Sequence, residues 1–168
     1  ISTRDWSSDV CSSDLDATAS VMICLRDGAR GTEVLLCRRA TRDGDPWSGH
    51  VGLPGGGVDP EDEHALAAAA RETREEVGFD PLVAGEVLGS LAPLRPRTFP
   101  IVIAAYVARI DRPVEIALSD EIAQAWWTPF ADLELVVADV PESPTRVSAL
   151  RLPHADAQDV VQIGRAHV

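Results

Sequence analysis

Residues 53–79 read LPGGGVDPEDEHALAAAARETREEVGF and carry the strongest structural signal in the chain. Its middle, Ala-Leu-Ala-Ala-Ala-Ala, consists of strong helix formers. Asp59 before Pro60 is typical of a helix N-terminus, and Gly78 is typical of a C-terminal cap. We therefore predict one helix over residues 60–77, preceded by a glycine loop whose backbone can pass close to a ligand.

The end of this predicted helix carries a cluster of acidic residues. Glu72, Glu75 and Glu76 are spaced i, i+3 and i+4, so their carboxylates project from one face. Three like charges repel one another, and a bound divalent cation compensates for that repulsion. Mg²⁺ takes one or two carboxylates, several waters and substrate phosphates. The pattern indicates metal-assisted attack of water on a phosphate bond, and the alternative is a solvated acidic helix face.

The spacing of these residues resembles the motif of the Nudix hydrolases, Gly-x5-Glu-x7-Arg-Glu-U-x-Glu-Glu-x-Gly-U, where U is aliphatic. The chain matches every fixed position from Gly57 to Gly78 and departs at Thr73 and Phe79. The resemblance implies an α/β fold, namely a Nudix-type α/β/α sandwich with a mixed β-sheet and one catalytic helix. It also implies hydrolysis of a nucleoside diphosphate linked to another group, with Mg²⁺ or Mn²⁺ as cofactor.

The resemblance further implies a role for each residue of the motif. The expected metal ligands are three carboxylates and a backbone carbonyl, those of Glu72, Glu75, Glu76 and Gly56. One of the three glutamates orients or deprotonates the attacking water. Gly55 is expected beside the substrate, and Glu63 is expected to be structural. Arg71 pairs with a carboxylate and holds its rotamer, or it forms a plain surface ion pair.

A further candidate for the catalytic base lies outside this motif. Glu121 belongs to Leu-Ser-Asp-Glu-Ile, residues 118–122, ahead of a Trp-Trp pair. Several Nudix branches place a catalytic or metal-binding glutamate in a comparable loop. The alternative is an acid that caps a short turn.

Residues upstream of the glycine loop are similar to an extra motif of the coenzyme A pyrophosphatase-like Nudix branch, Leu-Leu-Thr-x-Arg-(Ser/Ala)-x3-Arg-x3-Gly-x3-Phe-Pro-Gly-Gly. Cys37 replaces the threonine and Leu53 replaces the phenylalanine, while Arg42 lies near the second arginine but out of register. The matching positions are Leu35, Leu36, Arg39, Ala40, Gly49, Pro54, Gly55 and Gly56. This resemblance implies a coenzyme A-type substrate.

Three arginines are candidates for binding the substrate phosphates. A guanidinium suits bidentate phosphate binding, and we expect Arg39, Arg95 and Arg97 to line the cleft. The alternative for all three is surface solubility. Trp47 is a candidate for stacking on a base, with a packed loop anchor as the alternative.

The rest of the chain reads as strands around this helix. Two apolar runs flank a turn-rich link at residues 27–31 and predict a hairpin. The predicted strands cover residues 20–26, 33–39, 83–91, 101–109, 126–128 and 146–152, and a short helix covers residues 129–135.

The two ends of the chain have an unusual relation. Residues 9–15 can be encoded by GAC GTG TGC TCT TCC GAT CT, whose reverse complement encodes residues 163–168 and completes the codon of Gln162. We therefore expect residues 1–15 and 162–168 to be translated sequencing adapter from a metagenomic read. Residues 16–161 would then form a single domain that is truncated at its C-terminal end. The alternative is an ordinary disordered tail.

Composition limits the partners of the chain. The net charge is −12, which argues against nonspecific binding to nucleic acid or to acidic membranes. No apolar run reaches the roughly 18–20 residues of a membrane span. Cys24 and Cys37 lie in apolar runs and read as buried free thiols, consistent with a reducing cytoplasm. All 15 basic residues are arginine, which suggests a GC-rich bacterial genome.

Together these features predict a metal-dependent hydrolase of a pyrophosphate bond in a small nucleotide, with coenzyme A as the best match. The rival substrates are ADP-ribose, dinucleotide polyphosphates and nucleoside triphosphates. A rival of another class is a Nudix-fold binding module without catalysis. The complete set of three helix glutamates argues against that rival, because a binder need not keep it. The sequence leaves the oligomeric state open, with a homodimer as one candidate.

Overall fold

The computed structural model describes residues 16–44, 48–96, 100–138, 147–151 and 160–164. The predicted hairpin is confirmed, because β1 (Ala19–Gly28) and β2 (Gly31–Arg39) pair antiparallel. Gly28 lies opposite Gly31 across the turn, and the φ of Gly31 is 104°, in the left-handed region that glycine adopts readily.

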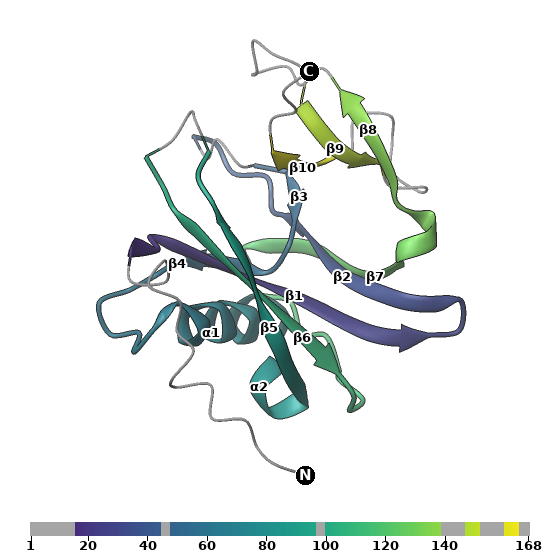
Figure 1. Ribbon diagram of the computed structural model, residues 1–168, viewed down its shortest axis with the longest axis horizontal. Helices are drawn as coiled ribbons and strands as arrows, with labels where there is room; N and C mark the ends of the chain where they lie inside the picture. The colour runs from purple at the N-terminus through teal and green to yellow at the C-terminus, as the bar shows by residue number, and fades with distance from the viewer. Residues whose placement is uncertain (1–15, 45–47, 97–99, 139–146, 152–159, 165–168) are drawn as a thin grey trace.

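This hairpin is the centre of a seven-stranded mixed sheet (Figure 1). The other strands are β3 (Val51–Gly52), β4 (Gly55–Gly57), β5 (Gly85–Leu94), β6 (Ile103–Ile110) and β7 (Ile122–Pro129). The sheet runs in the order β3-β2-β1-β6-β5, while β4 pairs with β1 and β7 pairs with β2. β1 and β6 are parallel, and the other pairs are antiparallel. The prediction of a mixed sheet is confirmed.

The helix of the motif, α1 (Ala65–Val77), begins at Ala65 instead of residue 60. The prediction that Asp59 caps this helix is wrong, because His64 is the N-cap and its Nδ1 accepts a hydrogen bond from the Ala67 N–H at 3.0 Å. Asp59 instead closes a turn with Asp62. The Asp59 N–H donates to the Asp62 carboxylate at 2.9 Å, and the Asp62 N–H donates to the Asp59 carbonyl at 3.0 Å.

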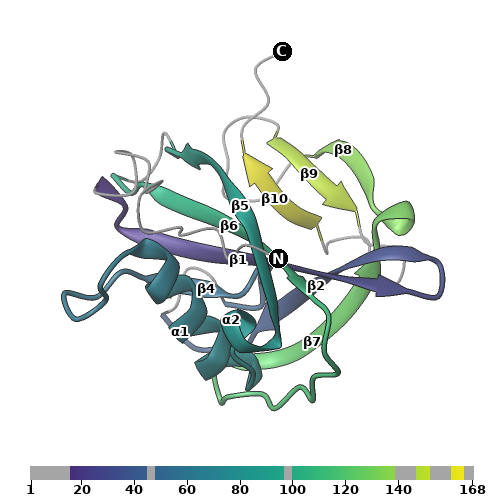
Figure 2. The same ribbon diagram turned by 60° about the horizontal axis from the view of Figure 1, so that its bottom comes forward.

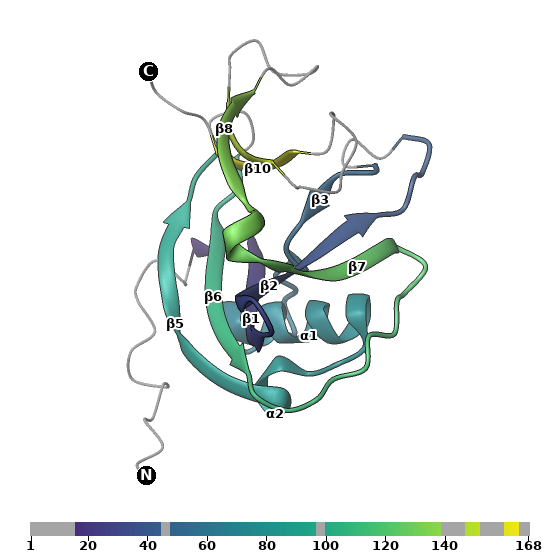
Figure 3. The same cartoon turned by 90° about the vertical axis from the view of Figure 1, so that its right-hand side faces the viewer.

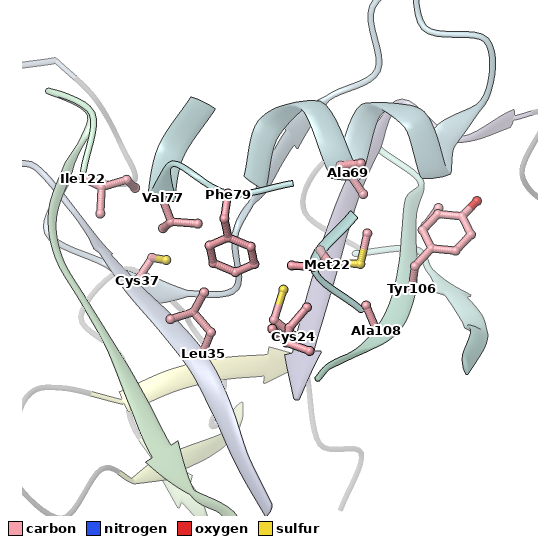
Figure 4. Close-up of a cluster of buried hydrophobic side chains, with 14 of the residues drawn as sticks. Met22, Cys24, Leu35, Cys37, Ala69, Val77, Phe79, Tyr106, Ala108 and Ile122 are labelled. Atoms are coloured by element: carbon pink, nitrogen blue, oxygen red, sulfur yellow. The ribbon is translucent and has the colours of Figure 1, made fainter. Parts of the chain in front are cut away.

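Small residues let α1 pack closely against the sheet. Ala68 and Ala69 are fully buried, and the core beneath the helix includes Met22 from β1 and Leu35 from β2 (Figure 4). Close contact of this kind supplies most of the stability of a short helix. α1 therefore holds a fixed position over one face of the sheet.

The two departures from the family motif both lie in the core. Phe79 is 7% exposed and belongs to the same buried cluster as Val77 (Figure 4). Thr73 is fully buried, and its hydroxyl donates a hydrogen bond to the Ala69 carbonyl at 2.7 Å. This bond satisfies the hydroxyl, so a threonine can occupy an apolar position without an unpaired polar group.

Cys24 and Cys37 are buried free thiols, as predicted. Burial raises the pKa of Cys24 to about 12 and also raises the pKa of Cys37 far above its usual range. Both are therefore neutral core residues with little nucleophilic character. Cys11 lies outside the described residues.

Two smaller elements complete the fold. α2 (Pro81–Ala84) follows α1 closely and occupies the start of a segment that we predicted as a strand (Figure 2). A three-stranded antiparallel sheet contains β8 (Glu134–Ala138), β9 (Val147–Arg151) and β10 (Val160–Gly164). It lies on the other side of the large sheet from α1 (Figure 3). The predicted α/β class with a mixed sheet is confirmed. Where the predicted α/β/α sandwich has its second helical layer, the described residues have this three-stranded sheet.

The remaining strand predictions agree with the structure within a few residues. The predicted short helix at 129–135 is a 3-10 helix over Phe130–Asp132, followed by β8. β10 includes residues 162–164, so the start of the C-terminal segment that we attribute to adapter pairs with β9. That attribution concerns the origin of the codons and stays a prediction. Within the described part of the chain, no helix is long and apolar enough to cross a membrane.

Candidate active site

The site is built where the glycine strand β4 meets the acidic face of α1. Gly55 lies opposite Val21 and Gly56 lies opposite Ser20 in the pairing of β4 with β1. A Cβ atom on Gly55 would lie 2.3 Å from the Ser20 carbonyl oxygen, so only glycine fits there. A Cβ atom on Gly56 would lie 2.6 Å from the carboxyl carbon of Glu72. The two glycines therefore bring the strand backbone against the glutamates of the helix.

Glu76 is the most deeply buried of these acids, with 5% of its surface exposed. Its Oε2 accepts a hydrogen bond from the Gly55 N–H at 3.0 Å, and its Oε1 lies 3.9 Å from a guanidinium nitrogen of Arg39. Burial is the main cause that raises the pKa of Glu76 to about 7; the charges of Glu72 and Glu121 act in the same direction, while the Gly55 hydrogen bond and the charge of Arg39 act against it. Glu76 is thus a carboxyl whose charged form is costly in the folded chain.

Arg71 organises the acidic residues around it. Its guanidinium donates to Glu72 at 2.9 Å, to Glu75 at 3.4 Å and to the Gly57 carbonyl at 3.0 Å. It also makes two bonds to Asp62, at 3.1 Å and 2.9 Å. The Arg71 side chain is 22% exposed, so this network is more than a plain surface ion pair. Arg71 therefore ties the turn before the helix to the metal-ligand candidates.

Asp62 is a residue of this network that sequence reasoning missed. The motif assigns the acid at this end of the helix to Glu63, but Glu63 is exposed. The Asp62 side chain is 8% exposed, and its hydrogen bonds with Arg71 lower its pKa. The length of the loop could have pointed to Asp62. The loop has one extra residue after the Pro-Gly-Gly turn, so the acid that reaches Arg71 is one position earlier than in the motif.

Glu72 and Glu75 differ in their surroundings although they share a helix face. The Glu72 side chain is 19% exposed, and burial raises its pKa against the lowering effect of Arg71. The Glu75 side chain is 56% exposed. Its ion pair within the described residues is with Arg71, at 3.4 Å. Glu72 and Glu76 are thus held against β4, whereas Glu75 faces solvent.

Glu121 approaches the site from a separate loop. The Ser119 N–H donates to the Glu76 carbonyl at 3.2 Å, which fastens this loop to the end of α1. The charge of Glu121 contributes to the raised pKa of Glu76, so the two carboxylates lie within electrostatic range. Glu121 also lies in a short turn, as the alternative prediction has it. The Glu121 N–H donates a hydrogen bond to the Ser119 hydroxyl at 3.3 Å.

The three arginine candidates lie in different places. Arg39 ends β2 beside Glu76, within reach of the acidic cluster. Arg95 is exposed and follows Leu94 at the end of β5. Arg97 and Trp47 lie outside the described residues.

The strand register gives the distance from Arg95 to the glycine strand. Leu94 lies opposite Ile103, Ile103 opposite Ala19, and Ala19 opposite Gly57. Three strand spacings separate the two ends, or about 14 Å at the usual spacing. Arg95 therefore shares an edge of the sheet with the site but does not touch the carboxylates.

The donor set fits a hard divalent cation. Glu72 and Glu76 present carboxylate oxygens to the backbone of β4, and a side chain at Gly56 would fill the space that Glu72 occupies. Burial raises the pKa of both carboxyls, and a divalent cation would relieve that cost. Among the described residues, no group of three or more His, Cys, Asp or Glu side chains is already gathered around a metal position.

Comparison with known proteins agrees with this geometry. A family model described as a NUDIX domain matches residues 16–149. An uncharacterised protein of Schizosaccharomyces pombe is 36% identical over 123 residues, which cover 68% of this chain and 35% of that protein. The peroxisomal coenzyme A diphosphatase ndx-8 of Caenorhabditis elegans is 38% identical over 116 residues, which cover 67% of this chain and 49% of that protein. The chain thus spans half or less of the length of these two relatives.

A solved structure agrees as well. The binary complex of a Caenorhabditis elegans Ap4A hydrolase superposes with a TM-score of 0.55 at 25% sequence identity, covering 65% of this chain and 77% of that chain. The family model matches most of the chain. The sandwich fold and the glutamates that face the glycine strand agree with that match. The chain belongs to the Nudix family.

Proposed function

We propose that this protein hydrolyses the pyrophosphate bond of a nucleoside diphosphate linked to another group, and that coenzyme A or a derivative is the substrate. The observation that carries the proposal is a pair of carboxylates packed against a glycine strand, the buried Glu76 and the partly buried Glu72. A pair of acids held in this way is unfavourable unless a cation joins it.

In this proposal Mg²⁺ or Mn²⁺ is held by the carboxylates and a strand carbonyl, those of Glu72, Glu75, Glu76 and Gly56. When bound, the cation polarises the phosphate oxygens and favours ionisation of water. Arg71 keeps Glu72 in place through its bond of 2.9 Å. Glu121, or one of the helix glutamates, takes a proton from the attacking water.

The remaining binding roles go to the arginines and to Gly55. Arg39 lies beside Glu76 and carries a fork of donors that suits phosphate oxygens. Gly55 is proposed to lie beside the substrate, in a strand backbone that its hydrogen bond of 3.0 Å to Glu76 holds in place. Arg95, about 14 Å from the glycine strand by the strand register, would contact the far part of a long substrate such as coenzyme A, which a small nucleotide would not reach, and we propose the same role for Arg97.

The relative named as a coenzyme A diphosphatase supports this choice of substrate, since it is 38% identical to the chain over 116 residues. A second candidate is a dinucleotide polyphosphate, which is favoured by the superposition with an Ap4A hydrolase at a TM-score of 0.55. We also propose a cytoplasmic location in a bacterium, supported by the buried free thiols of Cys24 and Cys37.

A mass-resolved assay tests the proposal. The purified chain would be offered coenzyme A, ADP-ribose, diadenosine tetraphosphate and ATP, each with Mg²⁺ or Mn²⁺. We expect coenzyme A to yield adenosine 3′,5′-bisphosphate and phosphopantetheine, with a kcat about 100-fold lower in Glu76→Gln.

The other outcomes of this assay separate the alternatives. Cleavage of a different compound would keep the chemistry and discard coenzyme A as the substrate. A folded chain that binds a nucleotide without cleaving it would favour the binding module.

A further inference from the structure

Two loops meet beside the acidic cluster, and one arginine joins them. The first loop, residues 40–44, follows β2, and the second loop, residues 117–121, precedes β7. The Ala40 N–H donates to the Glu121 carbonyl at 2.7 Å, which continues the pairing of β2 with β7. The backbone of Glu121 is therefore fixed relative to β2.

The second loop is also fixed to the catalytic helix. The Ala117 N–H donates to the Val77 carbonyl at 3.0 Å, and the Ser119 N–H donates to the Glu76 carbonyl at 3.2 Å. These bonds satisfy carbonyls at the end of α1 that have no partner within the helix. The loop that carries Glu121 thus has a defined position next to Glu76.

The side chain of Glu121 needs a separate restraint. It is 50% exposed, and its carboxylate carries the same charge as the nearby Glu76. Like charges repel, and a half-exposed glutamate can turn into solvent at little cost. A fixed backbone alone therefore does not keep this carboxylate near the acidic cluster.

Arg42 supplies such a restraint. One guanidinium nitrogen lies 3.0 Å from the Asp120 carboxylate and 3.1 Å from the Asp120 carbonyl, and the other lies 3.4 Å from the Glu121 carboxylate. The backbone N–H of Arg42 donates to the Ser48 hydroxyl at 2.8 Å, which holds the first loop. Arg42 is thus anchored on both sides and contacts the acid that we propose as a base.

We propose that Arg42 is a positioning residue for Glu121, a role that rests on the proposed function. Arg42 cancels part of the repulsion on the Glu121 carboxylate and limits its rotamers, so that the carboxylate stays near Glu76. Ion pairs between partly exposed residues contribute little to stability, so the main effect of Arg42 is expected on turnover.

Steady-state kinetics on six proteins test this role. They are the wild type, Arg42→Ala, Arg42→Lys, Glu121→Gln, the double variant Arg42→Ala/Glu121→Gln and the control Arg30→Ala. Arg30 is a matched control because it also forms a two-contact ion pair with an aspartate, Asp132, at the far tip of the hairpin. Thermal unfolding of each protein checks that it is folded.

We expect Arg42→Ala to lower kcat about tenfold with KM within about twofold of wild type, because Arg42 contacts the acid and not the substrate. Arg42→Lys should recover part of the loss, because it keeps the charge but not the fork of donors. The double variant should be no slower than Glu121→Gln, because both changes remove the same function. Arg30→Ala should match wild type.

Three results would overturn this role while leaving the proposed function intact. The first is an unchanged kcat and KM in Arg42→Ala. The second is a raised KM with unchanged kcat in that variant, which would indicate direct contact with the substrate. The third is a double variant whose loss in kcat equals the product of the two single losses. A folded wild type that cleaves none of the offered compounds would overturn the proposed function, and this role with it.

Discussion

At the residue scale, the register of the acid before α1 decides which side chain supports the site. Asp62 makes two bonds to Arg71 and accepts a third from the Asp59 N–H, whereas Glu63 is exposed. Arg71 in turn contacts Glu72. A substitution at Asp62 therefore acts on a metal-ligand candidate through one intermediate residue.

The variants Asp62→Ala and Glu63→Ala separate these two adjacent acids. We expect Asp62→Ala to lower the free energy of unfolding by about 2 kcal/mol, because the partly buried Arg71 loses two charged hydrogen bonds. It should also lower kcat several-fold. Glu63→Ala should change both quantities little. Urea unfolding and kinetics measure them, and a larger effect from Glu63→Ala would refute this assignment.

Much of the site could be predicted from residue types and spacing. The shared face of Glu72, Glu75 and Glu76 followed from helical geometry. The glycines were predicted to bring the backbone close to a ligand; the structure has Gly56 close to Glu72, and the approach to a ligand stays a prediction. The role of Arg42 could not be predicted. Its partners, at positions 120 and 121, are nearly 80 residues away in the sequence, and only the pairing of β2 with β7 brings them together.

At the element scale, the start of α1 was misjudged for a local reason. An aspartate followed by a proline is typical of a helix start, but Asp59 forms hydrogen bonds with Asp62 in a separate turn before the helix. That turn places Asp62 against Arg71, and the helix then begins at Ala65 with His64 as its N-cap. Histidine is a rare cap, because it must present an unprotonated nitrogen as acceptor.

The cap gives a prediction for the stability of the helix. His64→Ala removes the acceptor for the Ala67 N–H, and we expect a loss of about 1 kcal/mol in the free energy of unfolding. His64→Asn should retain most of the stability, since its carbonyl oxygen can accept the same bond. Chemical denaturation of the two variants is the measurement. Equal stability of His64→Ala and wild type would contradict the assignment of the cap.

The strands show why local patterns succeed where they do. In β1 buried and less buried residues alternate, and β2 contains a continuous apolar run. Turn residues separate the two strands, so their positions were predicted within a few residues. α2 was missed because four residues are too few for a helical period to appear. The parallel pairing of β1 with β6 joins residues more than 80 positions apart, which no local pattern encodes.

At the scale of the whole molecule, the acidic site works against the stability of the fold. Glu76 has a pKa of about 7 in the folded chain, against 4.5 for an ordinary glutamate. Its contribution to the free energy of unfolding is therefore full below pH 4.5 and is lost as the pH rises through 7. The shift corresponds to a loss of up to about 3 kcal/mol above pH 7. A bound cation would offset this loss.

If the acidic face of α1 binds a divalent cation, the cation should stabilise the folded chain through Glu76. Thermal unfolding of wild type and Glu76→Gln would be followed at pH 6 and pH 8, with and without Mg²⁺ or Mn²⁺. Without metal, we expect wild type to lose stability between pH 6 and 8, and Glu76→Gln to lose less and to be the more stable at pH 8. With metal at pH 8, wild type should gain several degrees and Glu76→Gln little. Equal stabilisation of both proteins by metal, or no stabilisation of wild type, would show that Glu76 does not bind the cation.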